Sequence, residues 1–195
     1  MSDTLNGSLL LVGAGKMGGA MLSGWLEDGL DPGQVLIQDP APPAEMAELL
    51  AGYAIAPASS FEKLPEPPDV IVLAVKPQVM DNVLPSVAPH VGLDTLVISV
   101  AAGRTVASLR KHIPDDAAIV RAMPNTPAAV ARGITGAFAT SDVSAAQRNL
   151  CTTLLSAIGK VVWVDSEPLI DSVTGVSGSG PAYVFHLVEA LAAAG

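Results

Sequence analysis

The sequence is poor in cysteine, in aromatic side chains and in basic residues, and each shortage limits what it can encode. Its single cysteine, Cys151, cannot form a disulfide within the chain, which is typical of proteins from a reducing compartment. Aromatic residues make up only 4% of the chain, whereas half of its residues are hydrophobic. The core must therefore be built from Ala, Val, Leu and Ile, which suit parallel strands covered by helices on both faces.

The shortage of basic residues gives the 195-residue chain a formal net charge of −9. An acidic chain repels phosphate backbones, so we expect no nucleic-acid partner. The charge does not exclude a small anionic ligand, because backbone N–H groups at the start of a helix bind phosphate without Lys or Arg. The first seven residues contain no Lys or Arg, and the apolar run that follows covers only residues 9–12. These features predict no signal peptide and no membrane partner, and we expect a cytoplasmic protein.

Short β-branched runs alternate with longer amphipathic stretches along most of the chain. The pattern predicts strands at residues 9–12, 35–39, 69–75, 96–100, 118–122, 161–164 and, more weakly, 135–139. It predicts helices at residues 16–28, 45–50, 106–112, 145–158 and 182–194. Ser144 with Gln147 three residues on predicts a capping box at the start of the helix at 145–158, and Gly159 predicts where that helix stops. Such alternation is typical of an α/β fold with a mainly parallel sheet and helices on both faces. We place this domain at residues 1–165 and the start of a separate helical domain at residues 166–195.

The last predicted helix is apolar nearly all round, a composition that is typical of buried helices. No segment of the sequence follows it that would bury it. We therefore expect either a further segment or a partner subunit to cover residues 182–194.

The strongest motif is the glycine pattern of residues 13–18, which follows the first strand and opens the first helix. Gly13 permits a tight turn, Gly15 lets the backbone approach a pyrophosphate, and Gly18 lets the helix pack close to the strand. The pyrophosphate would then meet free N–H groups and the positive end of the helix dipole. The pattern predicts a nicotinamide dinucleotide, NAD(H) or NADP(H). The alternative is a glycine-rich turn without a ligand.

An acidic residue, Asp39, ends the second predicted strand 21 residues after Gly18. An acid at this point usually accepts hydrogen bonds from the adenine-ribose hydroxyls and repels a 2′-phosphate. Residues 17–62 contain no Lys or Arg to offset it, so the local pattern favours NADH over NADPH. The preference stays open, because Ser59 is a potential hydrogen-bond donor to a phosphate and Asp39 could be only a turn residue before Pro40.

Four further motifs lie at strand ends or in turns, at residues 74–77, 99–103, 121–127 and 174–181. Ligands of open parallel sheets lie beyond the carboxyl ends of the strands, and the small residues of the second motif leave room for a flat ring. The first motif could instead be a strand end with a solvated Lys, the third a rigid turn, and the fourth a flexible Gly-Ser linker. No Ser-His-Asp or Cys-His arrangement and no metal-ligand spacing stands out. Hydride transfer needs fewer protein groups, because the cofactor carries the reactive bond.

Taken together, the motifs resemble the pyrroline-5-carboxylate reductase family over the whole chain. The resemblance rests on residues 12–18, 73–78 and 100–103, and most of all on the more specific segments 121–127 and 174–183. It implies a Rossmann domain followed by a helical dimerisation domain, and a homodimer or higher homo-oligomer formed through the C-terminal helices. It also implies NAD(P)H as hydride donor and a cyclic imine acid as acceptor, which is the last step of proline biosynthesis.

The resemblance further implies a set of site residues. It assigns the cofactor to Gly13, Ala14, Gly15, Lys16, Met17 and Gly18 at the pyrophosphate, to Val75, Lys76 and Pro77 in the cleft, and to Ala101, Ala102 and Gly103 near the nicotinamide. Asn125 and Glu167 match positions that lie close to the reacting centre in the family, so we expect them to be catalytic.

Members of this family continue beyond the point where the chain stops, so we expect a truncated chain whose own activity is open. The part that we expect to be absent holds most of the dimerisation helices and a Gly- and Thr-rich loop for the substrate carboxylate. Two alternatives remain. A related hydroxyacid-type dehydrogenase would place a Lys in the helix after the cofactor domain, but residues 161–195 contain no Lys or Arg. The second alternative is a dinucleotide-binding module that has no catalytic activity.

Overall fold

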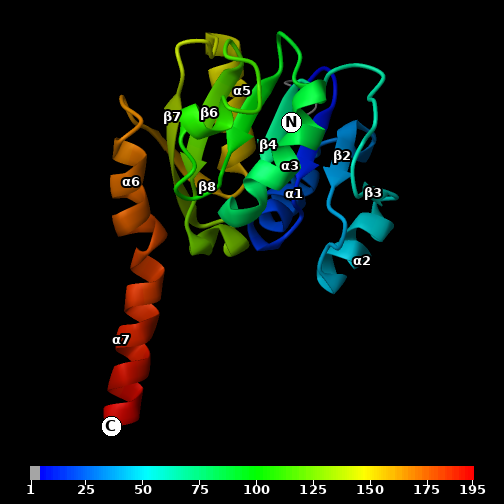
Figure 1. Cartoon of the computed structure of the whole chain (residues 1–195). Helices are drawn as coiled ribbons and strands as arrows, with labels where there is room; N and C mark the ends of the chain where they lie inside the picture. Colours follow the sequence, from blue (N-terminus) through cyan, green and yellow to red (C-terminus); the bar gives the residue numbers. More distant parts are fainter. Residues whose placement is uncertain (1–4) are drawn as a thin grey trace.

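A computed structural model describes residues 5–195, which form one eight-stranded sheet with helices on both faces (Figure 1). The strands are β1 (Leu9–Val12), β2 (Val35–Gln38), β3 (Pro57–Ala58), β4 (Val70–Leu73), β5 (Leu96–Ser99), β6 (Ala118–Met123), β7 (Gly133–Ala139) and β8 (Gly159–Trp163). The α-helices are α1 (Lys16–Glu27), α2 (Ala44–Gly52), α3 (Met80–Val87), α4 (Val106–Leu109), α5 (Ala145–Ser156), α6 (Leu169–Val173) and α7 (Gly180–Ala194). Short 3₁₀ turns cover Pro32–Gln34, Pro77–Val79, Ala88–His90 and Thr126–Val130, and a π-helical turn covers Thr174–Gly178.

The strand order is β3-β2-β1-β4-β5-β6-β7-β8, and every pairing is parallel except that of β6 with β7. The central strands read Leu-Leu-Leu-Val, Val-Ile-Val-Leu and Leu-Val-Ile-Ser and are buried throughout, as expected for strands covered on both faces. One core cluster includes Trp25 of α1 and Leu155 of α5, and the other includes Leu84 of α3 and Leu109 of α4. The predicted α/β fold is therefore confirmed.

The turn between β1 and α1 owes its shape to two glycines. Gly13 has φ +92°, and its N–H donates to the carbonyl oxygen of Gln38 across the sheet (2.9 Å). A Cβ built on Gly18 would lie 2.0 Å from the carbonyl oxygen of Gly13, which no structure tolerates. Gly18 therefore allows α1 to begin directly against the end of β1, as the sequence predicts.

The helix predicted at residues 145–158 is α5, and its predicted capping box is present. The Ser144 hydroxyl accepts a hydrogen bond from the Gln147 backbone N–H, while the Gln147 side chain accepts one from the Ser144 N–H. Gly159, predicted only as the helix stop, is also the first residue of β8. Its φ is +138°, and an added Cβ would lie 2.0 Å from the Gly133 carbonyl oxygen, so the glycine also serves strand pairing.

Two elements escape the sequence pattern, the helix α3 and the edge strand β3. The helix α3 starts just after Pro77 and contains Pro85, and prolines normally argue against a helix. Pro85 is the sixth residue of α3, beyond the first turn in which a helix tolerates a missing N–H, which is why the sequence pattern argued against a helix here. The strand β3 has only two residues, one of them a proline, which edge pairing with β2 accommodates.

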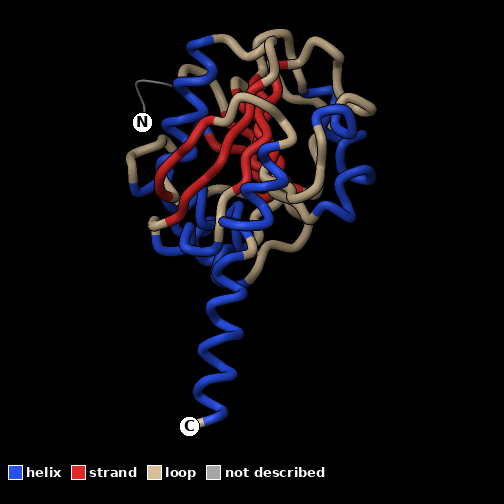
Figure 2. The backbone as a smooth tube through the Cα atoms, turned by 90° about the vertical axis from the view of Figure 1, so that its left-hand side faces the viewer, coloured by secondary structure: helices blue, strands red, loops and turns tan. Residues whose placement is uncertain are grey.

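The C-terminal part leaves the body of the molecule as one nearly continuous helical run (Figure 2). Val173, at the end of α6, packs on β7 where Gly136 leaves room for it. In the described structure α7 buries none of its residues. Its exposed apolar side chains are Tyr183, Val184, Phe185, Leu187, Val188 and Leu191. Within residues 5–195, no helix is both long and apolar enough to cross a membrane.

The contact between Gly18 and Gly13 predicts a large difference between two Gly→Ala variants. Gly18→Ala should destabilise the fold by about 1–3 kcal/mol or more, because α1 must move away from the Gly13 carbonyl oxygen. Gly52→Ala, in the last turn of α2, meets no described atom within 4 Å and should be neutral or stabilising by up to about 1 kcal/mol. Thermal unfolding of both variants checks this. Equal melting temperatures would contradict the proposed close contact.

Candidate functional site

A cleft of about 460 Å³ lies beyond the carboxyl ends of β1, β2 and β4. The strand order reverses between β1 and β4, and open α/β sheets bind ligands at such a switch point. The lining residues are Val12, Gly13, Gly15, Gln38, Asp39, Pro40, Ser59, Ala74, Val75, Lys76, Val79, Asn82, Val83 and Ser86. The cleft is thus formed by the glycine turn, by the segment after β2 and by α3.

The glycine turn gives the cleft an anion-binding end. The first N–H groups of any α-helix lack intrahelical partners, and here they belong to the start of α1 beside Gly15. A Cβ built on Gly15 would meet no described atom within 4 Å. Unlike Gly13 and Gly18, Gly15 is therefore not required by packing. Its missing side chain keeps open the space in which a phosphate would approach the helix.

Asp39 closes the cleft on the side of β2, and its carboxylate bonds to the backbone on two sides. Its Oδ2 accepts a hydrogen bond from the Ala14 N–H (2.7 Å), and its Oδ1 accepts one from the Ala41 N–H (2.9 Å). The residue therefore shapes the turn before Pro40 and also lines the cleft, so the two interpretations of Asp39 are compatible. Ser59 lines the same cleft.

The wall opposite the glycine turn comes from α3 and was missed by sequence reasoning. Asn82, Val83 and Ser86 line it, next to the side chain of Gln38. Gln38 Nε2 donates to the Ser86 hydroxyl (2.8 Å), which donates in turn to the Val83 carbonyl oxygen (2.8 Å). A signal was available, because the apolar residues of α3 recur at helical spacing. Pro77 before the helix and Pro85 within it concealed this signal.

The structure brings only part of the predicted cofactor set into this cleft. Gly13, Gly15, Asp39, Ser59, Val75 and Lys76 line it. Ala14 and Lys16 line an adjoining hollow between α1 and α2. Met17, Gly18, Pro77, Ala101, Ala102 and Gly103 line neither of these two hollows.

The predicted cofactor residues that line neither hollow lie in the core or in the loop after β5. Met17 packs against the hydrophobic core, and Gly18 is buried at the contact described above. Ala101 is buried, whereas Ala102 and Gly103 are exposed in the loop after β5. Their places beside a bound nicotinamide stay predictions.

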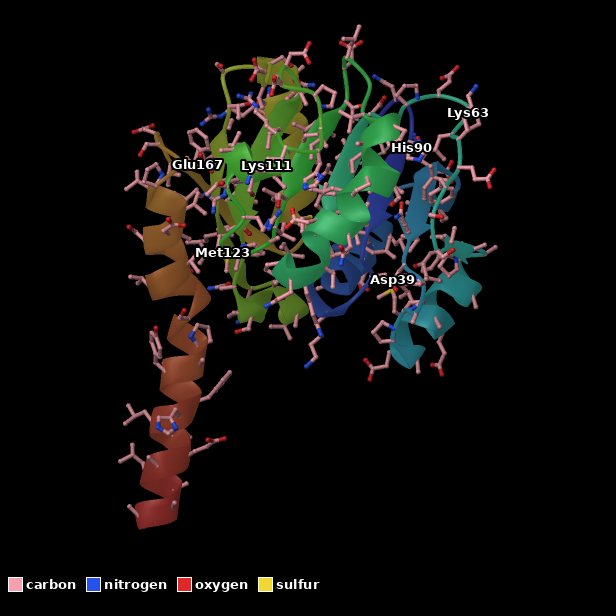
Figure 3. All side chains as sticks on the ribbon, viewed as in Figure 1. Asp39, Lys63, His90, Lys111, Met123 and Glu167 are labelled. Carbon is pink, nitrogen blue, oxygen red and sulfur yellow. The ribbon has the colours of Figure 1, made fainter. Side chains whose placement is uncertain are left out.

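The two predicted catalytic residues lie outside the cleft and are engaged with other groups. Asn125 Oδ1 accepts from the Ile134 N–H (2.9 Å), and its Nδ2 donates to the Ser177 hydroxyl (3.2 Å). Glu167 Oε1 accepts from the Val106 N–H (2.7 Å) and from Arg121 Nη1 (2.8 Å). Figure 3 shows Glu167 at the start of the C-terminal helices, on the side of the molecule away from Asp39.

The remaining candidate residues, the cysteine and the histidines, show no sign of a catalytic role in the described structure. Burial raises the pKa of the Cys151 thiol to about 12, which is the opposite of what a nucleophilic thiol needs. His90 is buried, with Nε2 3.0 Å from the Phe61 carbonyl oxygen. Within residues 5–195, no group of three or more His, Cys, Asp and Glu side chains has the arrangement of a metal site.

A surface cluster joins the start of α3 to the loop before α4. Arg104 forms two hydrogen bonds to the Asp81 carboxylate, and His112 Nε2 lies 2.9 Å from Asp81 Oδ1. The hydrogen bonds from Arg104, and then that from His112, lower the pKa of Asp81 below its usual value. The cluster therefore fixes the end of the loop that contains residues 101–103.

Known proteins resemble the chain in sequence along almost its whole length. A family model described as NADP oxidoreductase, coenzyme F420-dependent, matches residues 8–103, and one described as pyrroline-5-carboxylate reductase dimerisation matches residues 167–195. The pyrroline-5-carboxylate reductase of Pseudomonas aeruginosa is 41% identical over 188 residues, which cover 96% of the chain and 68% of that relative.

Solved structures agree with the sequence comparison. A pyrroline-5-carboxylate reductase from Coxiella burnetii superposes with a TM-score of 0.85 at 34% identity, covering 98% of this chain and 70% of that one. Pyrroline carboxylate reductase from Plasmodium falciparum, solved with NADP bound, gives a TM-score of 0.82 at 27% identity with the same coverage. From its fold, its cleft and these similarities, the chain belongs to the pyrroline-5-carboxylate reductase family.

Proposed function

We propose that the chain binds NADH or NADPH in the cleft beyond β1, β2 and β4 and reduces 1-pyrroline-5-carboxylate to L-proline, the last step of proline biosynthesis. The observation that carries this proposal is the glycine turn at the switch point of the sheet, in a chain 41% identical to a named reductase. The reductase from Plasmodium falciparum was solved with NADP bound, which supports the choice of cofactor.

The cofactor is proposed to lie along the cleft with its pyrophosphate at the start of α1. Gly15 and the free N–H groups of α1 would hold the pyrophosphate, and Asp39 with Ser59 would face the adenine ribose. Val75 and Lys76 would line the path of the dinucleotide toward the loop after β5. Residues 101–103 of that loop are proposed to lie beside the nicotinamide, as the family resemblance implies.

The reduction needs little acid–base chemistry from the protein. The bound nicotinamide supplies a hydride, which forms a C–H bond at the C=N carbon while the π electron pair moves to nitrogen. When the imine nitrogen already carries a proton, the product is the ring amine of proline without a further proton donor. The chain's task is then to hold donor and acceptor carbon about 3–3.5 Å apart in a fixed orientation.

Asn125 is proposed to lie close to the reacting centre. Its bonds to the Ile134 N–H and the Ser177 hydroxyl tie the turn after β6 to the π-helical turn of residues 174–178. π-helical turns are often found at functional sites. Asn125 would therefore fix the π-helical turn of residues 174–178, which is proposed to face the substrate. For Glu167, the bonds to Arg121 and Val106 support a positioning role rather than that of a proton donor.

The chain is proposed to divide near residue 165 into a cofactor domain and a helical dimerisation segment. The match to the dimerisation model begins at residue 167, and the exposed apolar side chains of α7 are of the kind that subunit interfaces bury. The proposed partner is a second copy of the chain.

The direct test is reductase activity in the protein produced from the complete gene. Oxidation of NADH or NADPH should follow addition of the cyclic imine acid, and proline should accumulate at one equivalent per cofactor. Absorbance of the reduced nicotinamide and chromatography of proline measure both. Failure to oxidise either cofactor, in protein that is folded by circular dichroism, would refute the proposed reaction.

A second prediction concerns the carboxylate of Asp39. Asp39→Ser should shift the ratio of kcat/KM values toward NADPH by about tenfold, because it removes the charge that would repel a 2′-phosphate. Asp142→Ser, which removes an acidic charge at the surface pair with Arg110, should leave the ratio unchanged. Steady-state kinetics with both cofactors measure the shift. The same ratio in both variants would show that Asp39 does not face the ribose.

A third prediction concerns Gly15. Gly15→Val should weaken cofactor binding roughly a hundredfold, about 2.7 kcal/mol, because its side chain would fill the space beside the start of α1. The melting temperature should change little, since a Cβ there meets no described atom. Calorimetric titration with NADH and thermal unfolding check the two parts. Full affinity in Gly15→Val would mean that the pyrophosphate binds elsewhere.

A further inference from the structure

Arg121 is a buried cation at the start of the motif of residues 121–127. It lies near the carboxyl end of β6, beside Ser99 of β5 and Phe138 of β7, and only 3% of its side chain is exposed. Burying a guanidinium is costly unless a charge pairs with it. The structure must therefore supply an acid next to β6, and that acid must come from another part of the chain.

Two acids from the C-terminal part supply the charge. Glu167 Oε1 lies 2.8 Å from Arg121 Nη1, and Asp171 Oδ1 of α6 lies 3.6 Å from Arg121 Nη2. Glu167 comes 46 residues after Arg121, directly before α6. The buried cation of the sheet therefore holds the first helix of the C-terminal segment.

The same oxygen of Glu167 has a second role. It accepts a hydrogen bond from the Val106 N–H at 2.7 Å. Val106 is the first residue of α4 and follows the loop of residues 101–105. One carboxylate oxygen thus contacts the end of this loop, the sheet and the segment that leads into the C-terminal helices.

We propose that Glu167 and Arg121 form a positioning pair that holds the loop of residues 101–105 in register with the C-terminal helices. The catalytic part of this inference rests on the proposed function, in which that loop lies beside the nicotinamide and the C-terminal segment carries the turn that faces the substrate. A misplacement of about 1 Å between donor and acceptor costs on the order of a hundredfold in rate. The pair therefore acts on kcat through the loop, without touching the reacting atoms.

The bonding of Glu167 separates this role from that of a proton donor. Its Oε1 accepts from a guanidinium and from a backbone N–H together, so it is used as a fixed acceptor. Its side chain is 27% exposed, and Figure 3 shows it away from the side of the molecule that carries Asp39. A residue that holds two other segments is a poor candidate for a group that must gain and lose a proton in each cycle.

The first test measures the link itself, in ligand-free protein from the complete gene. In Glu167→Gln, amides of residues 101–106 and of α6 should both exchange hydrogen about tenfold faster or more, because the Val106 N–H loses its charged acceptor and the segment before α6 loses its ion pair with Arg121. Asp142→Asn breaks the exposed Arg110–Asp142 pair, whose atoms are 2.7 Å apart, and should accelerate neither segment. Unchanged exchange in Glu167→Gln, or faster exchange in only one of the two segments, would overturn the link.

The second test separates positioning from stability. Glu167→Gln should lower kcat about tenfold or more, with the KM for cofactor within about threefold. The double variant Arg121→Met/Glu167→Leu replaces the pair by apolar side chains and should recover melting temperature. It should nevertheless keep a low kcat, because the Val106 N–H has lost its acceptor. Recovery of kcat together with melting temperature would show that the pair serves stability alone and would overturn the proposal.

These readouts distinguish two failures. Wild-type protein that oxidises no cofactor contradicts the proposed reaction, whereas the exchange result then still decides whether Glu167 links the two segments. If Glu167→Gln does not fold, the double variant carries both measurements in its place, with residues 101–106 expected to exchange faster than in the wild type. Wild-type exchange and wild-type kcat in that variant would contradict the positioning role.

Discussion

The arrangement of the site depends on one close backbone contact, that between Gly18 and the carbonyl group of Gly13. With no room for a Cβ at residue 18, α1 starts immediately at the end of β1 and its free N–H groups point beyond the sheet. The strand order reverses at this point, between β1 and β4, so no neighbouring crossover covers the helix end. The anion-binding end of the cleft follows from this contact, and Asp39 and α3 form the remaining walls.

A second constraint acts at the other side of the sheet. Arg121 is buried where β6 pairs with β5 and with the antiparallel strand β7, and its charge draws Glu167 to the sheet. Removing one partner of such a pair typically costs about 3–5 kcal/mol, which is far more than an exposed pair contributes. The glycine contact thus shapes the cleft, while the buried pair holds the start of the C-terminal segment against the sheet.

The sequence predicted the features that are local. Each of these features involves residues that are close together in the sequence: the buried runs of β1, β2, β4 and β5, the capping box at Ser144 and the glycine turn. Hydrophobic periodicity and turn chemistry are therefore enough to predict them. The family motifs identified the chemistry. In contrast, α3 was hidden by Pro77 and Pro85, and with it the wall of the cleft that contains Asn82 and Ser86.

The features that escaped prediction depend on contacts across the chain. The bond from the Ala14 N–H to Asp39 spans 25 residues, and the bond from Arg121 to Glu167 spans 46. No periodic pattern reports such pairs, because a side chain's partner is set by how strands and helices pack. For this reason the sequence showed neither the bond of Glu167 to Arg121 nor its bond to the Val106 N–H. The catalytic role that the family resemblance assigns to Glu167 stays a prediction.

The central claim is that a dinucleotide bound in this cleft transfers its hydride directly to the C=N carbon of a cyclic imine. Reduction of 1-pyrroline-5-carboxylate with NADH deuterated at either the pro-R or the pro-S position of C4 tests it most directly. A bound dinucleotide would expose only one face of its nicotinamide ring to the substrate, so deuterium should enter proline from only one of the two cofactors, at the carbon that formed the C=N bond. Proline without deuterium from both cofactors, or with deuterium at another carbon, would contradict the account.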